Sequence, residues 1–356
     1  MPSQNCSYGQ RIRRPLTWLG TRKEIVKQFL VRRWFLLALA CVLTIGFLFA
    51  TQLQFLAGGE TGRYARMAIV AGVLFLMSFP LGFGSFYESL RLPPALLATT
   101  VNYGLLPLVA WGLYFLVAPS IDQGLAIGIL VAAATPSTLA SAAVWTRRAG
   151  GNDTVALMVT VITNASCFII TPIWLFWMTG AEVQSLNMSS MIFKLLILVV
   201  LPMAFAQLLR RVGKVGSWAS RQKTPMGVMA QWGVLSMIFL GSINAGAKIR
   251  ESGVAASSLA LDGAIMMATI LGLHLAMLGV GHLLAYLLKM RRADRIAVGF
   301  SGSQKTLMVG LAIAVDDYSQ FGLAVLPMVT FHVGQLLVDT VVADYLKRHE
   351  KPQDAG

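Results

Sequence analysis

The chain has 356 residues, of which 56% are hydrophobic and 12% charged, and its mean hydropathy is +0.69. Soluble domains carry roughly twice that share of charged residues, so the composition predicts a polytopic membrane protein. The net charge of +14 does not indicate a nucleic-acid partner, because the basic residues fall in short clusters between apolar stretches. The three cysteines, Cys6, Cys41 and Cys167, have no metal-ligand spacing, so no disulfide framework and no metal site is predicted.

Residues 1–33 form a basic tail whose apolar side chains share one helical face, which predicts an amphipathic helix on an anionic membrane surface. Ten apolar runs of membrane-spanning length follow. Five of them make up residues 34–178, at 34–56, 67–83, 94–117, 125–146 and 156–178. A polar connection, 179–191, leads to five more in residues 192–346, at 192–208, 226–245, 261–288, 296–315 and 321–346, and residues 347–356 form a C-terminal tail.

An even number of spans places both termini on one side of the membrane. The loops on that side hold most of the loop Lys and Arg residues, in 147–148, 210–223, 289–295 and 347–351. Positive loops stay in the cytoplasm, so we expect a multi-pass protein of the cell membrane with both termini cytoplasmic. Five is an odd number, so two five-span sets that share a fold must insert in opposite directions. The expected fold class is therefore an all-α membrane protein built as two inverted five-helix repeats.

Two of the apolar runs are interrupted by polar residues. The first interruption is Thr135-Pro136-Ser137-Thr138 with Ser141, and the second is the run Ser301-Gly302-Ser303-Gln304-Lys305-Thr306. Uninterrupted helix cannot face lipid with such residues, so both helices are predicted to be discontinuous. They are the fourth span of each set, that is, the fourth and ninth spans. Matched interruptions in two halves indicate the substrate site of a secondary transporter.

The chemistry of a broken helix follows from its free ends. A half-helix that starts at the break attracts anions, and one that ends there offers carbonyl oxygens to cations. Pro136 ends the first half of its span. Ser137, Thr138 and Ser141 then either bind a dehydrated cation or only cap the second half-helix, and the sequence leaves both open.

Lys305 carries the strongest implication. A cation in the bilayer interior costs about 2.5 to 3.5 kcal/mol even on insertion scales, so it needs a carboxylate, water or an anionic substrate. Asp339 is the candidate carboxylate, and it shares a helix face with His332 and Gln335. An internal salt bridge remains the alternative to substrate binding. His274 and His282 are interpreted as core or interface residues, and further intramembrane polar groups are Asn102, Asn164, Thr160 and Ser166.

Several motifs together resemble the bile acid:sodium symporter family, in the branch of the seventh member of vertebrate solute carrier family 10 and its bacterial relatives. They are the run 135–152 ending in Gly150-Gly151-Asn152, then Thr171-Pro172, Gly302-Ser303-Gln304-Lys305-Thr306 and 332–336. The resemblance covers nearly the whole chain after the tail. It implies a panel domain of spans one, two, six and seven, and a core domain of the others, in which the crossed fourth and ninth spans hold the ions.

The family's sodium ligands carry over only in part. Gln304 matches the family glutamine, Thr160 a threonine ligand and Ser141 a serine ligand, while Asn102 stands where sodium-coupled members have glutamine. The shared acidic ligand falls at Phe300, and an asparagine of the sodium-coupled members is Lys305 here. The resemblance therefore puts sodium coupling in doubt and suggests a lysine in place of one sodium ion.

These observations predict a symporter-like secondary transporter for a small organic anion, with sodium or a proton as coupling ion, no cofactor and no enzymatic activity. The expected solute-binding residues are Lys305, Ser303, Thr306, Ser137, Thr138, His332 and Asn164. The expected ion-binding residues are Ser141, Thr160, Asn102, Gln304 and Ser301. Two alternatives stay open: a regulatory membrane protein that keeps the fold but does not transport, and a membrane enzyme using His332, Gln335 and Asp339, for which no nucleophile or nucleotide motif is present.

Overall fold

The computed structural model describes residues 22–82, 93–139, 141–180, 187–252 and 256–349, and every regular element in these ranges is a helix. Seven helical segments there are long and apolar enough to cross a membrane, and an eighth is counted if one sharply bent pair is a single span. The prediction of a multi-pass helical membrane protein is confirmed at this level. The basic N-terminal residues 1–21 lie outside the described ranges.

The first part of the described chain differs from the expected boundaries. Helix α1 (Arg22–Leu48) runs through residue 33 without a break, so the predicted tail and the first predicted span share one helix. At Phe49 the chain bends by 103° into α2 (Ala50–Ala57), which divides the run predicted as one span. The sequence 34–56 is mostly apolar, with Thr51, Gln52 and Gln54 after the bend and no proline, which is why hydropathy alone missed it.

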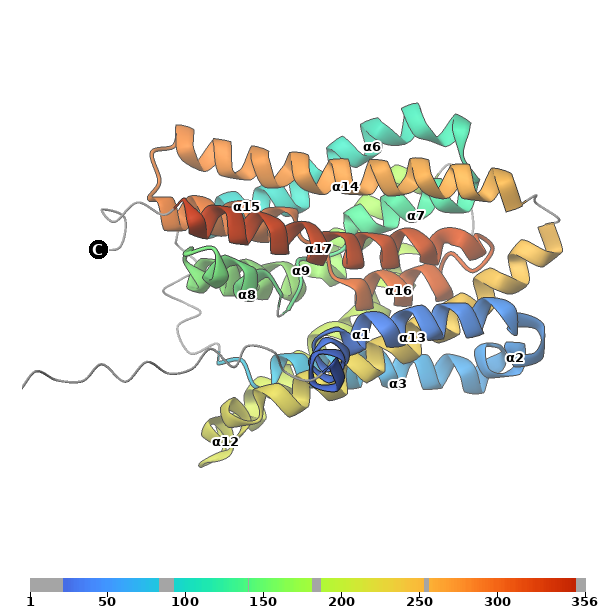
Figure 1. Ribbon diagram of the computed structural model, residues 1–356, viewed down its shortest axis with the longest axis horizontal. Coiled ribbons are helices and arrows are strands. Elements are labelled where there is room, and N and C mark those ends of the chain that lie inside the picture. Colours follow the sequence, from blue (N-terminus) through green and yellow to red (C-terminus); the bar gives the residue numbers. More distant parts are fainter. Residues whose placement is uncertain (1–21, 83–92, 140, 181–186, 253–255, 350–356) are drawn as a thin grey trace, which may run out of the picture.

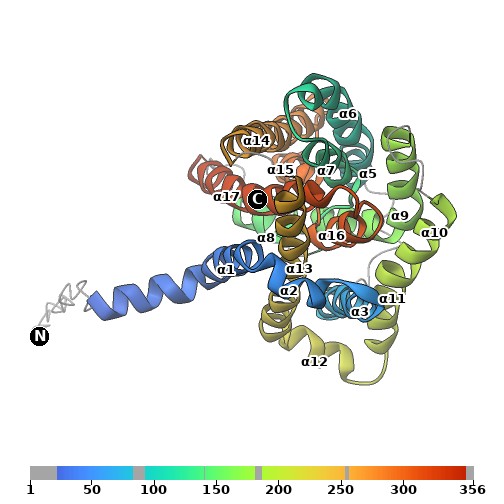
Figure 2. The ribbon, with the colours of Figure 1, turned by 90° about the vertical axis from the view of Figure 1, so that its right-hand side faces the viewer.

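Two layers of helices make up the molecule (Figure 1). The small layer contains α1 and α2, together with α3 (Gly59–Ser78), α11 (Leu201–Leu209), α12 (Val215–Arg221) and α13 (Lys223–Ser252). Helix α13 packs against α1, α2 and α3, and α11 packs against α3. Figure 2 shows this layer end-on below the rest of the molecule.

The large layer contains the remaining membrane helices. It is built from α5 (Pro93–Thr100), the π-helix η1 (Val101–Leu105), α6 (Leu106–Val117), α7 (Gln123–Ala134), α8 (Ser141–Arg148), α9 (Asp153–Thr179), α14 (Ala256–Leu287), α15 (Arg292–Ser303), α16 (Leu307–Asp316) and α17 (Val325–Arg348). Short 3-10 turns precede α7 (η2, Ala118–Ser120) and α17 (η4, Gly322–Ala324). Helix α10 (Met188–Leu195) and the π-helix η3 (Leu196–Val200) connect α9 to α11.

Helices α7 and α16 form the centre of the large layer. Every described residue of α7 after Gln123 and every residue of α16 before Asp316 is buried. Both sequences are apolar on all sides, which is typical of helices with no lipid-facing side. Gly128 permits the close contact of α7 with η4, because a Cβ there would lie 2.6 Å from the carbonyl oxygen of Ala324.

Both predicted helix interruptions are present. Residues 135–139 between α7 and α8 are not helical, and neither are residues 304–306 between α15 and α16. Pro136 cannot donate the backbone hydrogen bond that would continue α7. The polar residues of the second interruption compete for backbone groups that a continuing helix would use.

Candidate functional site

The two interruptions meet inside the large layer. The backbone N–H of Thr306 donates to the carbonyl of Pro136 at 2.8 Å, and Ser137 Oγ donates to the carbonyl of Ser301 at 3.1 Å. All four residues lie away from the surface. Segments about 165 residues apart in the sequence therefore hydrogen-bond to one another where each helix is broken.

Helix α9 supports the first interruption with side chains. Thr171 Oγ1 donates to the carbonyl of Ala134 at 2.8 Å, and Thr160 Oγ1 donates to the carbonyl of Thr138 at 2.8 Å. Asn164 Nδ2 lies 2.9 Å from the carbonyl of Ser137. A buried backbone carbonyl without a partner is costly, so these neutral groups of α9 allow the chain to leave helical conformation here.

Side chains from two other helices support the second interruption. Asn102 Nδ2 lies 3.2, 3.3 and 2.9 Å from the carbonyl oxygens of Ser301, Gly302 and Gln304. Gln335 of α17 accepts from the Lys305 N–H at 2.9 Å and donates to the Lys305 carbonyl at 3.0 Å. The carbonyls at the end of α15 are therefore partnered without a helical continuation.

The π-helix η1 frees a carbonyl for this site. Within it the N–H of Leu106 donates to the carbonyl of Val101, five residues back. In the same register the carbonyl of Asn102 would accept from residue 107, but Pro107 has no N–H. The Asn102 carbonyl is thus left without a helical donor, which is a common property of π-bulges at functional sites.

The ammonium group of Lys305 occupies the position that this carbonyl faces. Its Nζ lies 2.7 Å from the Asn102 carbonyl, 3.2 Å from Asn102 Oδ1 and 2.8 Å from the Thr135 carbonyl. It also lies 5.4 Å from the centre of the Tyr103 ring, a cation–π contact. An ammonium has three N–H donors, and here three oxygens receive them, while Lys305 is 2% exposed.

The salt bridge between Lys305 and Asp339, left open as the alternative to substrate binding, is not formed. Asp339 is fully buried on α17, and its carboxylate accepts a hydrogen bond from Gln304 Nε2 and lies 2.9 Å from His274 Nε2. The sequence pattern correctly placed Asp339 on an inward-facing stripe, but it gave no information on which partner across the layer the carboxylate would meet. The Lys305 ammonium contacts backbone carbonyl oxygens and not the carboxylate. Every residue has such a carbonyl, so the sequence could not show which ones would face the lysine.

Gln304 connects this carboxylate to hydroxyl groups of the first interruption. Its Oε1 accepts from Thr138 Oγ1 at 2.9 Å and from Ser141 Oγ at 3.0 Å. The two hydroxyl oxygens are 2.6 Å apart, and Thr138 Oγ1 also caps α8 by accepting from the Ala142 N–H. Of the two roles left open for these hydroxyls, capping is seen at Thr138, and cation binding stays a prediction.

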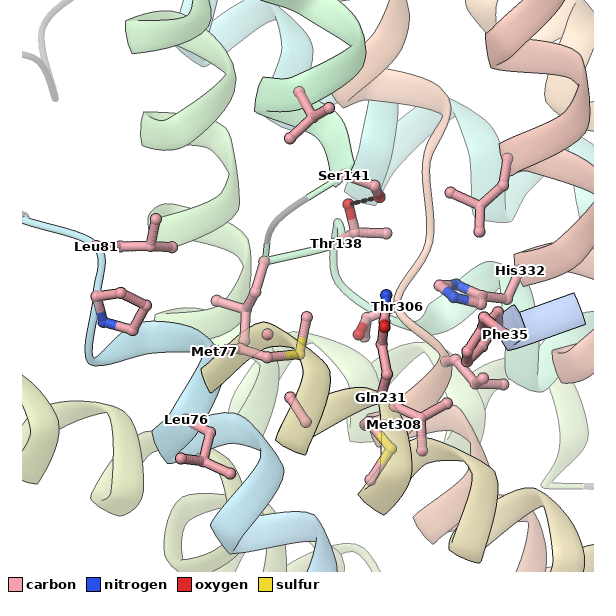
Figure 3. A pocket seen from close by; sticks show the side chains of 18 of the residues that line it. Phe35, Leu76, Met77, Leu81, Thr138, Ser141, Gln231, Thr306, Met308 and His332 are labelled. Atoms are coloured by element: carbon pink, nitrogen blue, oxygen red, sulfur yellow. Dashed lines mark hydrogen bonds between the residues drawn. The ribbon is translucent and has the colours of Figure 1, made fainter. Parts of the chain in front are cut away.

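A cavity of about 340 Å³ lies between the two layers beside these hydroxyls. Figure 3 shows Thr138, Ser141, Thr306 and His332 on its large-layer wall. The small layer contributes mainly apolar side chains and two polar ones, which are Phe35, Leu76, Met77, Leu81, Gln231 and Lys223. The cavity is therefore mostly apolar, and each of the two interruptions contributes polar groups to its wall.

The other predicted site residues lie behind this wall. The hydroxyls of Ser301 and Ser303 donate back to carbonyls of α15, from Ala297 and Phe300. Lys305, Gln304, Asn102, Thr160, Ser137 and Asn164 surround the crossing and do not line the cavity. Asn164 Oδ1 is buried and has no hydrogen-bond partner among the described residues.

Sequence reasoning missed three contributors to the site. They are the Thr135 carbonyl, the Tyr103 ring and His274, which was interpreted as an ordinary core residue. The sequence held a signal for a different backbone group: Pro107 cannot donate to the Tyr103 carbonyl in an α-helix or to the Asn102 carbonyl in the π-helix η1. The Tyr103 carbonyl accepts from Trp174 Nε1 at 2.7 Å instead.

The opposite end of the interface between the layers is closed by ion pairs. Arg66 of α3 lies 2.9 Å from Asp316 at the end of α16, and Lys194 of α10 lies 3.2 Å from Asp316 and 2.7 Å from Asp317. The Arg66 and Asp316 side chains are each 10% exposed. A second, more polar cavity of about 250 Å³ lies near them and is lined by Arg66, Asn244 and Lys248 among others.

An interrupted pair of crossed membrane helices beside an inter-layer cavity is the architecture of a membrane transporter. The profile of the SBF-like CPA transporter family matches residues 33–348, so the chain belongs to that family. It is 29% identical over 259 residues to an uncharacterized protein of Pseudomonas aeruginosa, covering 72% of this chain and 76% of that protein. It is 24% identical over 244 residues to sodium/bile acid cotransporter 7 of Rattus norvegicus, covering 66% of this chain and 68% of that protein. The cotransporter 7 of Danio rerio is 24% identical over 251 residues, with 68% and 71% covered. The resemblance inferred from the motifs is therefore confirmed.

Proposed function

We propose that the protein is a secondary active transporter that moves a small amphipathic organic anion by alternating access. The observation that carries this proposal is the cavity between the layers, whose polar wall is formed by both helix interruptions. A solute there contacts the two broken helices and the small layer together, which alternating access requires of a substrate site.

The finer architecture belongs to the same proposal. The seven long apolar segments and the bent pair of α1 and α2 supply eight spans. Helix α3 and the pair α7 and α8, which are shorter or less apolar, would supply two more, giving ten spans in two inverted sets. The small layer would then be the panel domain and the large layer the core domain, with both termini in the cytoplasm of the cell.

The cavity walls favour an amphipathic anion as solute. Helix α16 begins at Leu307, and its N-cap residue Thr306 makes no side-chain cap hydrogen bond, so the positive end of the helix lies at the cavity wall formed by Thr306, Leu307 and Met308. Lys223 adds a cation at the cavity wall, and the apolar side chains fit a hydrocarbon part. The names of the cotransporter relatives state a bile acid, and the present cavity is consistent with the broader class of amphipathic anions.

Lys305 has a different role in this proposal from that of a direct anion receptor. Its ammonium is held by three oxygens of the protein and lies behind the cavity wall. It would act as a permanent cation at the crossing, in the place that the family resemblance assigns to a sodium ligand. Gln304, Thr138 and Ser141 remain the groups nearest to the cavity that a coupling ion or the solute would contact.

Closure at the far end supports alternating access. The pairs of Arg66 and Lys194 with Asp316 and Asp317 join the two layers at the end opposite to the larger cavity. The larger cavity lies toward the Arg- and Lys-rich end, which the positive-inside rule places in the cytoplasm. The structure would then represent an inward-facing state, and breaking these ion pairs would be part of opening to the outside.

A cavity-filling variant tests the proposal. Gly227 of α13 lines the cavity, and Gly263 of α14 lies outside it. Both glycines have open space around the position that a Cβ would take. Proteoliposomes would be given a mixture of radiolabelled organic anions, under imposed sodium or proton gradients. We expect saturable uptake by the wild type and by Gly263→Phe, and a loss of at least about tenfold in Gly227→Phe.

Equal uptake by Gly227→Phe and Gly263→Phe would refute the assignment of the cavity. A different pair of results would identify the non-transporting regulatory protein. The wild type would bind anions saturably and Gly227→Phe would not, while no preparation would show gradient-driven uptake. Binding is measured by the thermal shift of the purified protein, so the two outcomes are separable.

A further inference from the structure

A buried acid–base pair lies directly behind the crossing. His274 of α14 and Asp339 of α17 are both 0% exposed, and His274 Nε2 lies 2.9 Å from Asp339 Oδ1. The second ring nitrogen, Nδ1, lies 3.3 Å from the carbonyl of Ser303, the last residue of α15. Thus one imidazole connects a carboxylate to the backbone at the second interruption.

The geometry fixes the proton content of the pair. Both ring nitrogens face acceptors, a carboxylate and a carbonyl, so both contacts are hydrogen bonds only if two protons are present. One proton sits on Nδ1, and the other lies between Nε2 and Oδ1, on either atom. When the second proton leaves, the imidazole keeps a single N–H and must give up either Asp339 or the Ser303 carbonyl.

We infer that the His274–Asp339 pair is the binding site of a coupling proton, and that Gln304 transmits its occupancy to the cavity. This inference rests on the proposed transport function. The proton joins a basic nitrogen and a carboxylate, and no covalent bond or redox step is involved. Buried ionisable groups inside a membrane domain are typical of proton relays.

Gln304 provides the connection. Its Nε2 donates to Asp339, while its Oε1 accepts from Thr138 and Ser141 at the cavity wall. A proton carried on Asp339 Oδ2, the oxygen that faces Gln304, would donate to that amide, which would then turn and present Nε2 to the same two hydroxyls. The position of the proton within the pair therefore decides which donors and acceptors the cavity offers to a solute.

Charge at the crossing favours an anion only in the protonated state. The pair is neutral with its proton and carries one negative charge without it, whereas Lys305 adds one positive charge when it is protonated, the form that donates to all three of its oxygen partners. The crossing then alternates between a net charge of +1 and zero. A monoanionic solute and a proton would be bound together, because the proton leaves the charge of Lys305 uncompensated.

Other charged groups lie near the elements that pack on α14 and α17, and none contacts Asp339 among the described residues. Helix α7 has no ionisable side chain. The ionisable residues of the other neighbouring elements are, on α8, Arg147 and Arg148; on α13, Lys223, Lys248, Arg250 and Glu251; and on α14, Asp262, His282 and Tyr286. Those on α15 are Arg292, Asp294 and Arg295, and α16 has Asp316. Those on α17 are His332, Asp344, Tyr345, Lys347 and Arg348, while α6 has Tyr114 and η1 has Tyr103. Of these, His332 and Lys223 line the cavity, and their titration must be separated from that of the pair.

Infrared difference spectroscopy of the full chain in lipid nanodiscs tests the inference without any solute. We expect the wild type to lose one buried band as the pH is raised, a carboxyl band if the proton lies on Asp339 or an imidazolium band if it lies on His274, and Asp339→Asn to lack this transition. Asp344→Asn, five residues further along α17, and His282→Gln, two turns further along α14, serve as controls that keep the transition. A wild-type spectrum with neither transition, or a transition that Asp339→Asn retains, would overturn the proton site.

His274→Gln covers the case in which Asp339→Asn does not fold. Glutamine cannot take up a proton, so the transition should disappear or change its midpoint by at least about one pH unit, and an unchanged midpoint would refute the pair. The result is independent of the transport proposal. Gradient-driven uptake with no titrating pair would leave transport intact and exclude this proton site, whereas a titrating pair without uptake would refute transport alone.

Discussion

The two helix interruptions are supported in opposite ways. At the first, between α7 and α8, the carbonyls of Ala134, Ser137 and Thr138 are held by neutral hydroxyl and amide groups of one neighbour, α9, and only the Thr135 carbonyl meets a charged group, the Lys305 ammonium. At the second, between α15 and α16, the support comes from η1, α14 and α17, and a lysine and an acid–base pair are buried with it. A neutral support fixes one chain path, whereas one that includes ionisable groups can exist in more than one charge state. The second interruption is therefore the place where we expect ions to act.

Four substitutions test this difference between the interruptions, and Lys305→Met should lower the free energy of unfolding the most. It leaves three buried acceptors without their donor, so we expect a loss of unfolding free energy of about 3 to 5 kcal/mol. The measurement is SDS-induced unfolding in mixed micelles. Lys248→Met is the control, since Lys248 forms an exposed pair with Glu251, and its change should stay within about 0.5 kcal/mol. Similar stabilities of the two variants would show that the ammonium contributes nothing to the second interruption.

Asn102→Leu comes next in size. The substitution removes the Nδ2 group beside three carbonyls and one oxygen of the Lys305 site. Intramembrane hydrogen bonds are worth about 0.6 kcal/mol on average and up to about 1.7, so a loss of about 2 to 3 kcal/mol is expected from several together. The exposed Thr100→Ala, two residues earlier, is the control. A loss of only about 0.6 kcal/mol, that of one average hydrogen bond, would show that the Asn102 side chain is not the main support of the second interruption.

Thr171→Val tests the neutral support with a smaller change. The valine has the same shape but leaves the Ala134 carbonyl without the donor that Thr171 provides, for an expected loss of about 1 kcal/mol. Thr269→Val of α14 is the matched control, because its hydroxyl bonds within its own helix, to Ile265. A loss as large as that of Lys305→Met would contradict the distinction between the two interruptions.

Tyr103→Phe should have the smallest effect of the four. The phenylalanine keeps a ring beside Lys305 and loses the hydroxyl contacts with the Thr163 carbonyl at 2.9 Å and with Thr171 Oγ1 at 3.5 Å, so we expect less than about 1 kcal/mol. Tyr103→Leu removes the ring as well and should cost about 0.5 to 2 kcal/mol more. Equal unfolding free energies for the two variants would exclude a cation–π contribution.

The interruptions were predictable because proline and clustered polar residues in an apolar run leave few other conformations. The same physics placed Asp339 and Gln335 on the inward face of α17, at a spacing of four residues. The partner of Lys305 was not predictable in this way. Two of its three oxygens are backbone carbonyls, and their availability depends on where the chain of η1 and residue 135 runs in space.

The bend at Phe49 and the roles of His274 escaped prediction for a related reason. Residues 34–56 are as apolar as a straight span, and the bend follows from how α2 packs against α13, a contact between distant segments. His274 lies in an apolar stretch of the sequence. Its role depends on contacts with Ser303 and Asp339, which lie 29 and 65 residues away in the sequence.

The oxygens around Lys305 have a consequence for how such a site is lost or kept as sequences diverge. The carbonyls of Asn102 and Thr135 exist whatever side chains stand at those positions, so side-chain replacement there cannot delete them. What can delete the site is the return of an N–H at residue 107, or a straightened α7, because either would give a carbonyl back to its helix. A proline that touches neither solute nor ion would thus be as hard to replace as the lysine itself.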